Sequence, residues 1–266
     1  MTDENILSKL GSELKPYEGT DPLPQDLGKD SKEAFKQIVR ARRSIRLFDG
    51  EKIPDEVMDS IFSDVTLSPT SSNLQPWQFY WIRDTDKKKR AAEACLGQPA
   101  ATSASELIAC VARPDLWDKN RKALIAMMTE NGSRDLPKPV ASYYKKLIPK
   151  VMKTDFIGIN NFARRLLFTI TGWKQPMVRV PVNRGDHRIW AHNQVCLGAQ
   201  TLMLSATAHG YDSCPMGGFD EYRVKKILGL PKGAEVTMMM ALGKRKPEGL
   251  YGPRLRLPQE DVILKV

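Results

Sequence analysis

The chain has 266 residues, of which 41% are hydrophobic, and it carries a formal net charge of +10. Its length allows one full hydrophobic core. No apolar run approaches the roughly 20 residues that span a bilayer, and the N-terminus lacks the basic residues that begin a secretory signal peptide. We therefore expect a cytoplasmic protein without a membrane partner. The positive charge attracts anions in general, which suits either nucleic acid or an enzyme with phosphate-bearing cofactors.

The first third of the chain predicts an arm followed by two helices. Residues 1–30 are polar and interrupted by prolines and glycines, which is typical of an arm on the surface of a single domain over residues 31–266. Ser31 is placed to cap a helix that runs through Arg42, because apolar residues recur there at helical spacing. Pro54 opens a second helix with one apolar face, which ends in a cluster of serine, threonine and proline.

The rest of the chain alternates strands and helices. Strands are predicted over 77–82, 107–112 and 234–242, and a long helix over 186–209, ended by Gly210. Residues 214–219 predict a turn, Asp220 caps a short helix, and 249–258 form an extended tail. Because no strand is followed by Gly-x-Gly-x-x-Gly, an α+β sandwich fits better than a doubly wound sheet.

Two arginine pairs are candidates for an anion site. Arg42, Ser44 and Arg46 alternate, so in an extended segment they point to one side, and Arg254 and Arg256 repeat this spacing. Guanidinium forks match phosphate oxygens two at a time. The alternative is a solvated helix end, which a basic chain also produces.

The segment 69–77 is a candidate for holding a polar ring. Pro69 and Pro76 prevent a regular helix, while Asn73 and Gln75 each carry a donor and an acceptor, as the pyrimidine edge of a flavin requires. The alternative is an ordinary loop between a helix and a strand.

The chain shows no motif for side-chain catalysis or metal binding. It lacks a nucleophile elbow, a phosphate-binding P-loop and paired carboxylates, and its cysteines and histidines do not have ligand spacing. We therefore predict no metal, no catalytic side chain, and a cofactor that carries the chemistry. Flavin mononucleotide (FMN) has a phosphate at one end and a polar-edged ring at the other.

Five pieces follow one another in order: Arg-Arg-Ser-Ile-Arg (42–46), Ser-Pro-Thr-Ser-Ser-Asn-Leu-Gln-Pro-Trp (68–77), Gly-Tyr-Asp-Ser-Cys-Pro-Met-Gly-Gly-Phe-Asp (210–220) after the long helix, Ala-Leu-Gly-Lys-Arg (241–245) and Pro-Arg-Leu-Arg-Leu-Pro (253–258). This ordered set resembles the FMN-dependent nitroreductase family from about residue 33 to the C-terminus. The resemblance implies a three-layer α+β fold, with a central, mostly antiparallel sheet flanked by helices. It also implies an intertwined homodimer with FMN at the subunit interface, touched by both chains.

The resemblance also implies a set of cofactor-binding residues. Arg46 would lie near N1 and the C2 carbonyl of the ring, and the Gly217 N–H would point at N5. The phosphate would be held by Arg42, Arg43, Ser44, Arg254 and Arg256; the partner subunit would supply Pro69, Thr70, Ser71, Asn73 and Gln75; and Pro215, Met216, Gly217, Gly218, Gln194 and Gln98 would complete the site.

Two features depart from the family pattern. Some relatives have glutamate where this chain has Gly217, so any role of that carboxylate is absent here. Residues 113–190, which should include the cover over the flavin, match no subgroup. Substrate choice is expected to depend on this segment, whose aromatic candidates are Tyr143, Tyr144, Phe156, Phe162, Phe168 and Trp173.

The implied function is an FMN-dependent NAD(P)H oxidoreductase with NADH or NADPH as electron donor. It would reduce nitroaromatics, quinones or similar electron-poor acceptors by ping-pong hydride transfer. The alternatives are a specialised enzyme of the same fold, such as a reductive dehalogenase or a flavin-fragmenting enzyme, and, from another class, a basic nucleic-acid-binding module. We predict that nucleic acid is not a partner, because no known nucleic-acid-binding motif accompanies the charge.

Overall fold

The structure is a computed structural model that describes residues 27–153, 159–174, 176 and 181–266. The predicted N-terminal arm therefore lies almost entirely outside the described residues, as does Phe156, and the side chain of Phe162 is also not described. The boundary between arm and domain stays a prediction.

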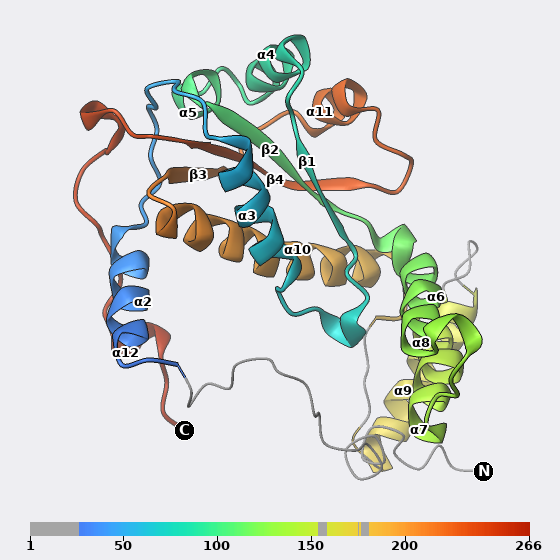
Figure 1. Cartoon of the computed structure of the whole chain (residues 1–266). Coiled ribbons are helices and arrows are strands. Elements are labelled where there is room, and N and C mark those ends of the chain that lie inside the picture. The colour runs from blue at the N-terminus through green and yellow to red at the C-terminus, as the bar shows by residue number, and fades with distance from the viewer. Residues whose placement is uncertain (1–26, 154–158, 175, 177–180) are drawn as a thin grey trace.

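A four-stranded antiparallel sheet forms the centre of the molecule (Figure 1). Its order is β1 (Trp77–Trp81), β2 (Glu106–Ala112), β4 (Glu235–Gly243) and β3 (Asp212–Met216). Every residue of β2 is buried, because helices cover both faces of the sheet there. The chain therefore places β1 and β3 at opposite edges.

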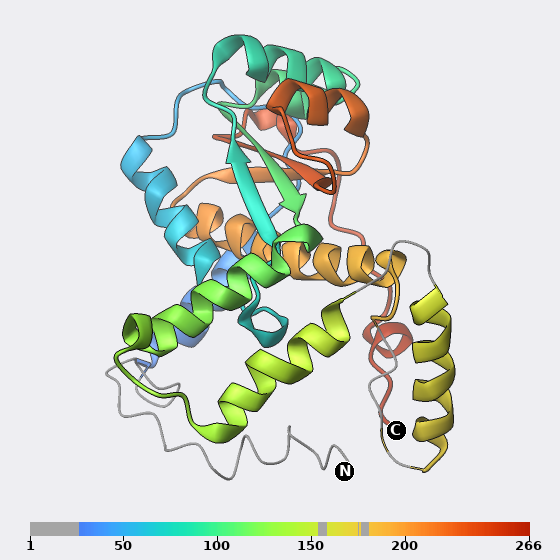
Figure 2. The same cartoon turned by 90° about the vertical axis from the view of Figure 1, so that its right-hand side faces the viewer.

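Helices cover the two faces and make three layers, as predicted (Figures 1 and 2). On one face α3 (Asp55–Thr66) and α10 (Arg184–Ala208) pack against the sheet through a buried apolar cluster that includes Ile61, Val195 and Leu202. The other face is covered by α4 (Thr85–Ala94), α5 (Pro99–Ser103) and α11 (Glu221–Leu228).

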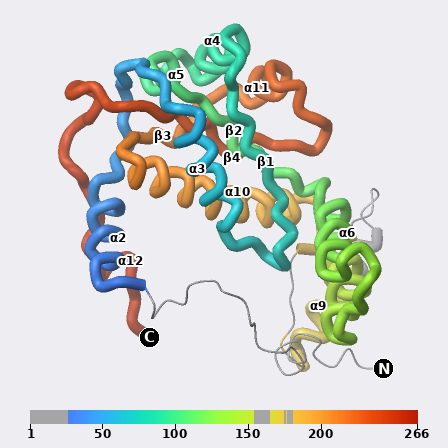
Figure 3. The backbone as a smooth tube through the Cα atoms, in the orientation of Figure 1, coloured from blue at the N-terminus to red at the C-terminus, as the bar shows by residue number. Residues whose placement is uncertain are grey.

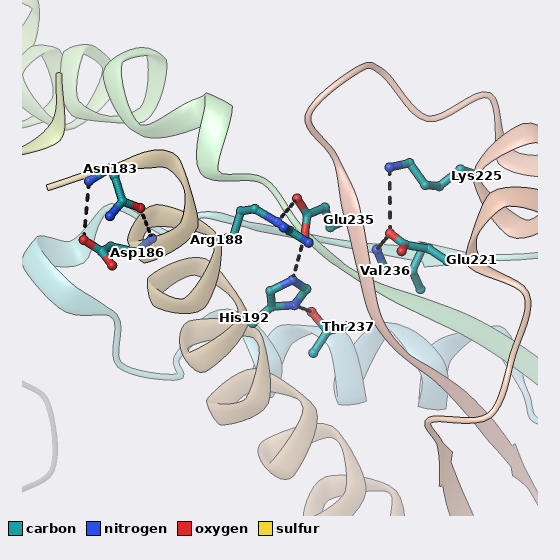
Figure 4. A network of polar contacts seen from close by, with 9 residues as sticks. All are labelled: Asn183, Asp186, Arg188, His192, Glu221, Lys225, Glu235, Val236 and Thr237. Carbon is teal, nitrogen blue, oxygen red and sulfur yellow. Dashed lines mark hydrogen bonds and ion pairs between the residues drawn. The ribbon is translucent and has the colours of Figure 1, made fainter. Parts of the chain in front are cut away.

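Helix α10 has strong start and stop signals. The Asn183 side chain accepts from the Asp186 N–H at 2.9 Å, while the Asp186 carboxylate accepts from the Asn183 N–H, which forms a capping box (Figure 4). The helix ends before Gly210, which has a left-handed φ of +79°. At Gly198 an added Cβ would lie 2.8 Å from the Phe79 ring, so glycine lets α10 approach β1 closely.

Two further parts extend from this sandwich. Beyond β2 lie α6 (Trp117–Met128), α7 (Lys138–Ser142), a π-helical segment (Tyr143–Leu147), α8 (Ile148–Met152) and α9 (Ile159–Lys174). At the other end α2 (Asp30–Ala41) precedes the arginine segment, and the tail after β4 runs down on the α2 side to α12 (Gln259–Val262) (Figure 3). Single 3₁₀ turns lie at Ser71–Asn73, Pro114–Leu116, Glu130–Gly132 and Pro247–Gly249.

Two local predictions are wrong. Residues 214–216 belong to strand β3 rather than to a turn. Pro215 is tolerated there because β3 is an edge strand, so the N–H that proline lacks need not be part of the ladder. Helix α2 begins at Asp30, before Ser31, and has no side-chain cap.

Among the described residues, no helix combines the length and the apolar character needed to cross a membrane. Within the same ranges, no group of three or more histidine, cysteine, aspartate or glutamate side chains is arranged to hold a metal ion.

Candidate functional site

The first arginine segment leaves α2 and runs extended beside β3. Arg42 is the C-cap of α2, and Ser44 forms a parallel bridge with Ser213, whose carbonyl accepts from the Ile45 N–H at 3.1 Å. Ile45 is fully buried. Because side chains alternate in an extended segment, Ser44 and Arg46 point away from the core on the other side.

The C-terminal tail returns to the same place. Arg254 Nη2 donates to the main-chain oxygens of Arg40 at 2.7 Å and Arg42 at 2.8 Å, which lie at the end of α2. Arg43 Nη2 donates to the Gly252 oxygen at 2.9 Å. These contacts join two segments more than 200 residues apart in the sequence, so the predicted arginine pairs do meet.

The guanidinium groups gathered here have no acidic partner within the part of the chain that the structure describes. The pKa of Arg42 is lowered from its ordinary value by partial burial and then by the positive charges of Arg254, Arg256 and Arg43. Clustered like charges without a counter-charge are a site for an anion, because an anion relieves their repulsion.

Arg46 lies beside this cluster and has an aromatic neighbour that the sequence analysis did not identify. Its guanidinium carbon lies 5.2 Å from the centre of the Tyr251 ring, within the range of a cation–π contact. The only sequence signal for Tyr251 was its place in the tail just before Arg254. Burial raises the pKa of the nearby Cys214 thiol, although the charges of Arg46 and Arg42 act in the opposite direction.

The end of β3 leads into the predicted glycine turn. Met216 is buried and Gly217 is exposed, and a Cβ added to Gly217 would have no heavy atom within 4 Å. Gln98 holds the turn, because its Nε2 donates to the Gly218 oxygen at 2.6 Å and to the Cys95 oxygen at 2.9 Å. The main chain at Gly217 is therefore open to a flat ligand while the turn itself is fixed.

The second group of predicted residues forms a compact loop before β1. The Thr70 hydroxyl accepts from the Gln75 N–H at 3.1 Å, and Gln75 Nε2 donates to Asn73 Oδ1 at 3.2 Å. Gln194 of α10 joins them, since its Oε1 accepts from the Ser71 N–H at 2.8 Å. Pro69 is exposed at the start of the loop.

Within one chain these two groups are not brought together. The loop leads directly into β1, whereas the arginine segment pairs with β3, at the opposite edge of the sheet. Neighbouring strands lie about 4.8 Å apart, so three spacings separate the edges by roughly 14 Å. Each chain thus presents a phosphate-type half-site and a separate polar loop.

The aromatic candidates of the α6–α9 segment have different surroundings. Tyr143 and Tyr144 contact the loop through Ser72, a residue absent from the predicted set. Phe168 is buried and Trp173 is exposed. The motif contained Ser72, but sequence offers no signal for a contact between residues 71 positions apart.

Comparison with known proteins agrees with this geometry. Residues 39–244 match the model of the nitroreductase family. YdgI of Bacillus subtilis, whose name places it among the NAD(P)H nitroreductases, is 30% identical over 224 residues, covering 83% of this chain and 93% of that protein. The oxygen-insensitive NADPH nitroreductase of Helicobacter pylori is 27% identical over 223 residues, covering 81% and 90% of the two chains.

Solved structures give the same result. Bacillus subtilis YdfN superposes with a TM-score of 0.68 at 26% identity, covering 88% of this chain and 100% of that one. A nitroreductase in complex with FMN from Exiguobacterium sibiricum has a TM-score of 0.62 at 27% identity, covering 86% and 95%.

Proposed function

The chain belongs to the nitroreductase family, and on that premise we propose that it is an FMN-dependent NAD(P)H oxidoreductase that reduces nitroaromatics, quinones or similar electron-poor acceptors. The observation that carries the proposal is the arginine cluster around Arg42, which has no acidic partner in the described ranges and lies on the same strand edge as the open turn at Gly217. This combination fits a ligand with a phosphate and a flat ring.

The phosphate end is assigned to the guanidinium groups of Arg42, Arg43 and Arg256 and to the Ser44 hydroxyl. Arg254 has a different part, because its Nη2 already donates to two carbonyls at the end of α2. It fixes the tail that carries Arg256 and adds positive charge. Bidentate guanidinium contacts to phosphate oxygens are stronger than neutral hydrogen bonds and give orientation as well as affinity.

The ring end is assigned to the turn and to Arg46. FMN held here would supply the hydride chemistry that links NAD(P)H to an acceptor in two half-reactions. The exposed main chain at Gly217 would lie against the ring and offer its N–H to N5. Arg46 places a fixed positive charge where negative charge develops on reduction, which lowers the barrier without a proton transfer.

We propose that the polar loop completes this site in a second copy of the chain, so that the enzyme is a homodimer. Apolar side chains lie exposed on α10 and in the tail, among them Ile189, Leu197, Leu255 and Leu264. An extended tail with this composition is unfavourable in water unless it packs against another surface. A partner subunit would cover it and bring the Thr70–Asn73 loop to the arginine cluster.

The cytoplasm stays the predicted location.

Flavin spectroscopy tests the proposed function. Purified protein should show flavin absorbance, or gain it when FMN is added, and anaerobic NADH or NADPH should bleach it. Protein that stays colourless with added FMN would refute the proposal, and a salt-dependent gel shift without flavin would favour nucleic-acid binding instead. Turnover of a panel of nitroaromatics and quinones above the oxidase background separates a general reductase from a specialised member of the fold.

A further inference from the structure

The polar loop, residues 69–76, has a main-chain conformation that is unfavourable without outside support. Ser72, Asn73 and Gln75 have left-handed φ values of 55°, 52° and 45°. Serine and glutamine disfavour this region because Cβ crowds the main chain there, whereas asparagine tolerates it better. Such a loop persists only when neighbouring structure restrains it.

Two tyrosines provide a restraint at the first of these residues. The Tyr143 and Ser72 hydroxyls lie 2.6 Å apart, and the Tyr144 hydroxyl donates to the Ser72 main-chain oxygen at 3.1 Å. The tyrosine rings pack edge to face, with centroids 5.1 Å apart and an interplanar angle of 84°. One bond therefore holds the side chain of Ser72 and the other holds its peptide group.

The two tyrosines lie where the α-helical turn of α7 gives way to a π-helical one. In a regular α-helix, consecutive side chains point about 100° apart. Tyr143 begins the π-helical segment Tyr143–Leu147, a wider turn that is frequent at functional sites. Burial, and then the proximity of Tyr143, raises the pKa of Tyr144 above its ordinary value.

Further contacts fix the rest of the loop. Asn120 of α6 donates from Nδ2 to the Leu74 oxygen at 2.9 Å and to the Gln75 oxygen at 3.0 Å. The Leu74 side chain is buried and packs in a cluster with Ile148 and Met152 of α8. The loop is thus held from the helical segment after β2 as well as by α10.

We propose that Tyr143 and Tyr144 are positioning residues that hold Ser72 in its left-handed conformation and so preorganise the loop to receive FMN. This inference rests on the proposed function, in which Thr70, Ser71 and Asn73 contact the cofactor. Without the two hydroxyls, FMN binding must also order the loop, which lowers affinity. Residues 113–190, which are expected to govern substrate choice, therefore also contribute to cofactor binding through these two tyrosines.

Double-mutant cycles on the full-length protein test this inference. FMN dissociation constants are measured by flavin fluorescence for Tyr143→Phe, Tyr144→Phe and Ser72→Ala, and for each tyrosine variant combined with Ser72→Ala. Each tyrosine variant should weaken FMN binding about fivefold, as expected for one hydrogen bond. Tyr143→Phe and Ser72→Ala should be non-additive, because they remove the two ends of one bond. Tyr144→Phe and Ser72→Ala should be additive, because alanine keeps the main-chain carbonyl.

Controls distinguish a positioning role of the two tyrosines from a general loss of protein stability. They also distinguish it from failure of the proposed function. Tyr222→Phe removes a hydroxyl from an exposed tyrosine on α11 and should leave FMN affinity unchanged. The melting temperature without FMN should stay within a few degrees of wild type in every variant. If wild type binds no FMN, the proposed function fails. If wild type binds FMN and both tyrosine variants match Tyr222→Phe, or if the Tyr143 and Ser72 changes are additive, the positioning role is overturned.

Discussion

Arg254 and Arg256 lie two residues apart in the tail, yet their surroundings differ. Arg254 donates to the carbonyls of Arg40 and Arg42, which the end of α2 leaves without helical partners. Arg256 is exposed, and its Nη1 donates to the oxygen of the neighbouring Leu255 at 2.6 Å. The family resemblance implies the same phosphate-binding role for both arginines, whereas the structure separates them.

Alanine variants should therefore separate binding from stability. Arg256→Ala should lower FMN affinity by about 1.5–3 kcal/mol, the range for a charged hydrogen bond, with an unchanged melting temperature. Arg254→Ala should lower both, because α2 loses the donor at its last carbonyls. Fluorescence titration and thermal unfolding measure the two effects. Arg254→Lys is the matched control, since it keeps the charge but not the fork. Unchanged FMN affinity in both alanine variants would remove these arginines from the site.

Gly217 gives a second test of the binding site. A Cβ there has open space and the glycine does not require a left-handed φ, so Gly217→Ala should fold normally. Because some relatives carry glutamate here, the methyl group should leave FMN affinity close to that of wild type. Gly217→Pro instead removes the N–H assigned to flavin N5 and should lower FMN affinity about fivefold, as expected for one hydrogen bond. At Gly249 a change to alanine places Cβ 2.3 Å from the Leu47 oxygen, so Gly249→Ala should mainly lower the melting temperature. A Gly217→Pro protein with normal FMN affinity would place the ring elsewhere.

The first half of α10 is tied to β4 by a network of charged and polar side chains (Figure 4). Glu235 accepts from Arg188 at 2.5 Å and contacts His192 Nε2 at 3.0 Å, while His192 Nδ1 lies 2.8 Å from the Thr237 hydroxyl. Burial would raise the pKa of Glu235, but the hydrogen bonds from Arg188 and His192 outweigh it and hold that pKa below its ordinary value.

Because of this network, the free energy of unfolding should fall as the pH becomes acidic. A carboxylate with a lowered folded-state pKa stabilises the protein above its unfolded pKa of about 4.3, and this stabilisation is lost as pH falls through the folded-state value. Glu235→Gln should therefore melt at a lower temperature than wild type at pH 7, with the difference shrinking below pH 4. Glu93→Gln, at an exposed position on α4, is the control and should match wild type throughout. A difference that does not change with pH would contradict the linkage.

The elements that the sequence predicts well are those whose signals are local. The apolar spacing of α3 and α10, the Asp220 cap and the β-forming run before Trp81 each determine their own segment. Pro215 was misread because its meaning depends on where the strand lies in the sheet. The contacts between Tyr143 and Ser72 and between Arg254 and Arg40 join distant segments, and no local pattern encodes them.

The molecule as a whole presents two half-sites at opposite edges of one sheet, which gives the dimer a direct test. Asn73→Ala weakens the loop half-site and Arg256→Ala weakens the arginine half-site. A mixed dimer of the two, isolated with two different tags, should contain one site with both changes and one intact site, and should bind about half the wild-type FMN. Each parental homodimer should bind less. No recovery in the mixed dimer would mean that each site lies within one chain.

The arginine cluster also joins two segments that lie very far apart along the chain. Arg254 meets Arg40 across 214 positions, so β4 and every helix from α2 to α11 are synthesised before this pair can form. Closing a loop of that length is slow compared with forming local helices and hairpins. Phosphate binding should accordingly appear late in refolding, after the sheet has assembled, and ribosome-bound chains that end before Arg254 should retain no flavin.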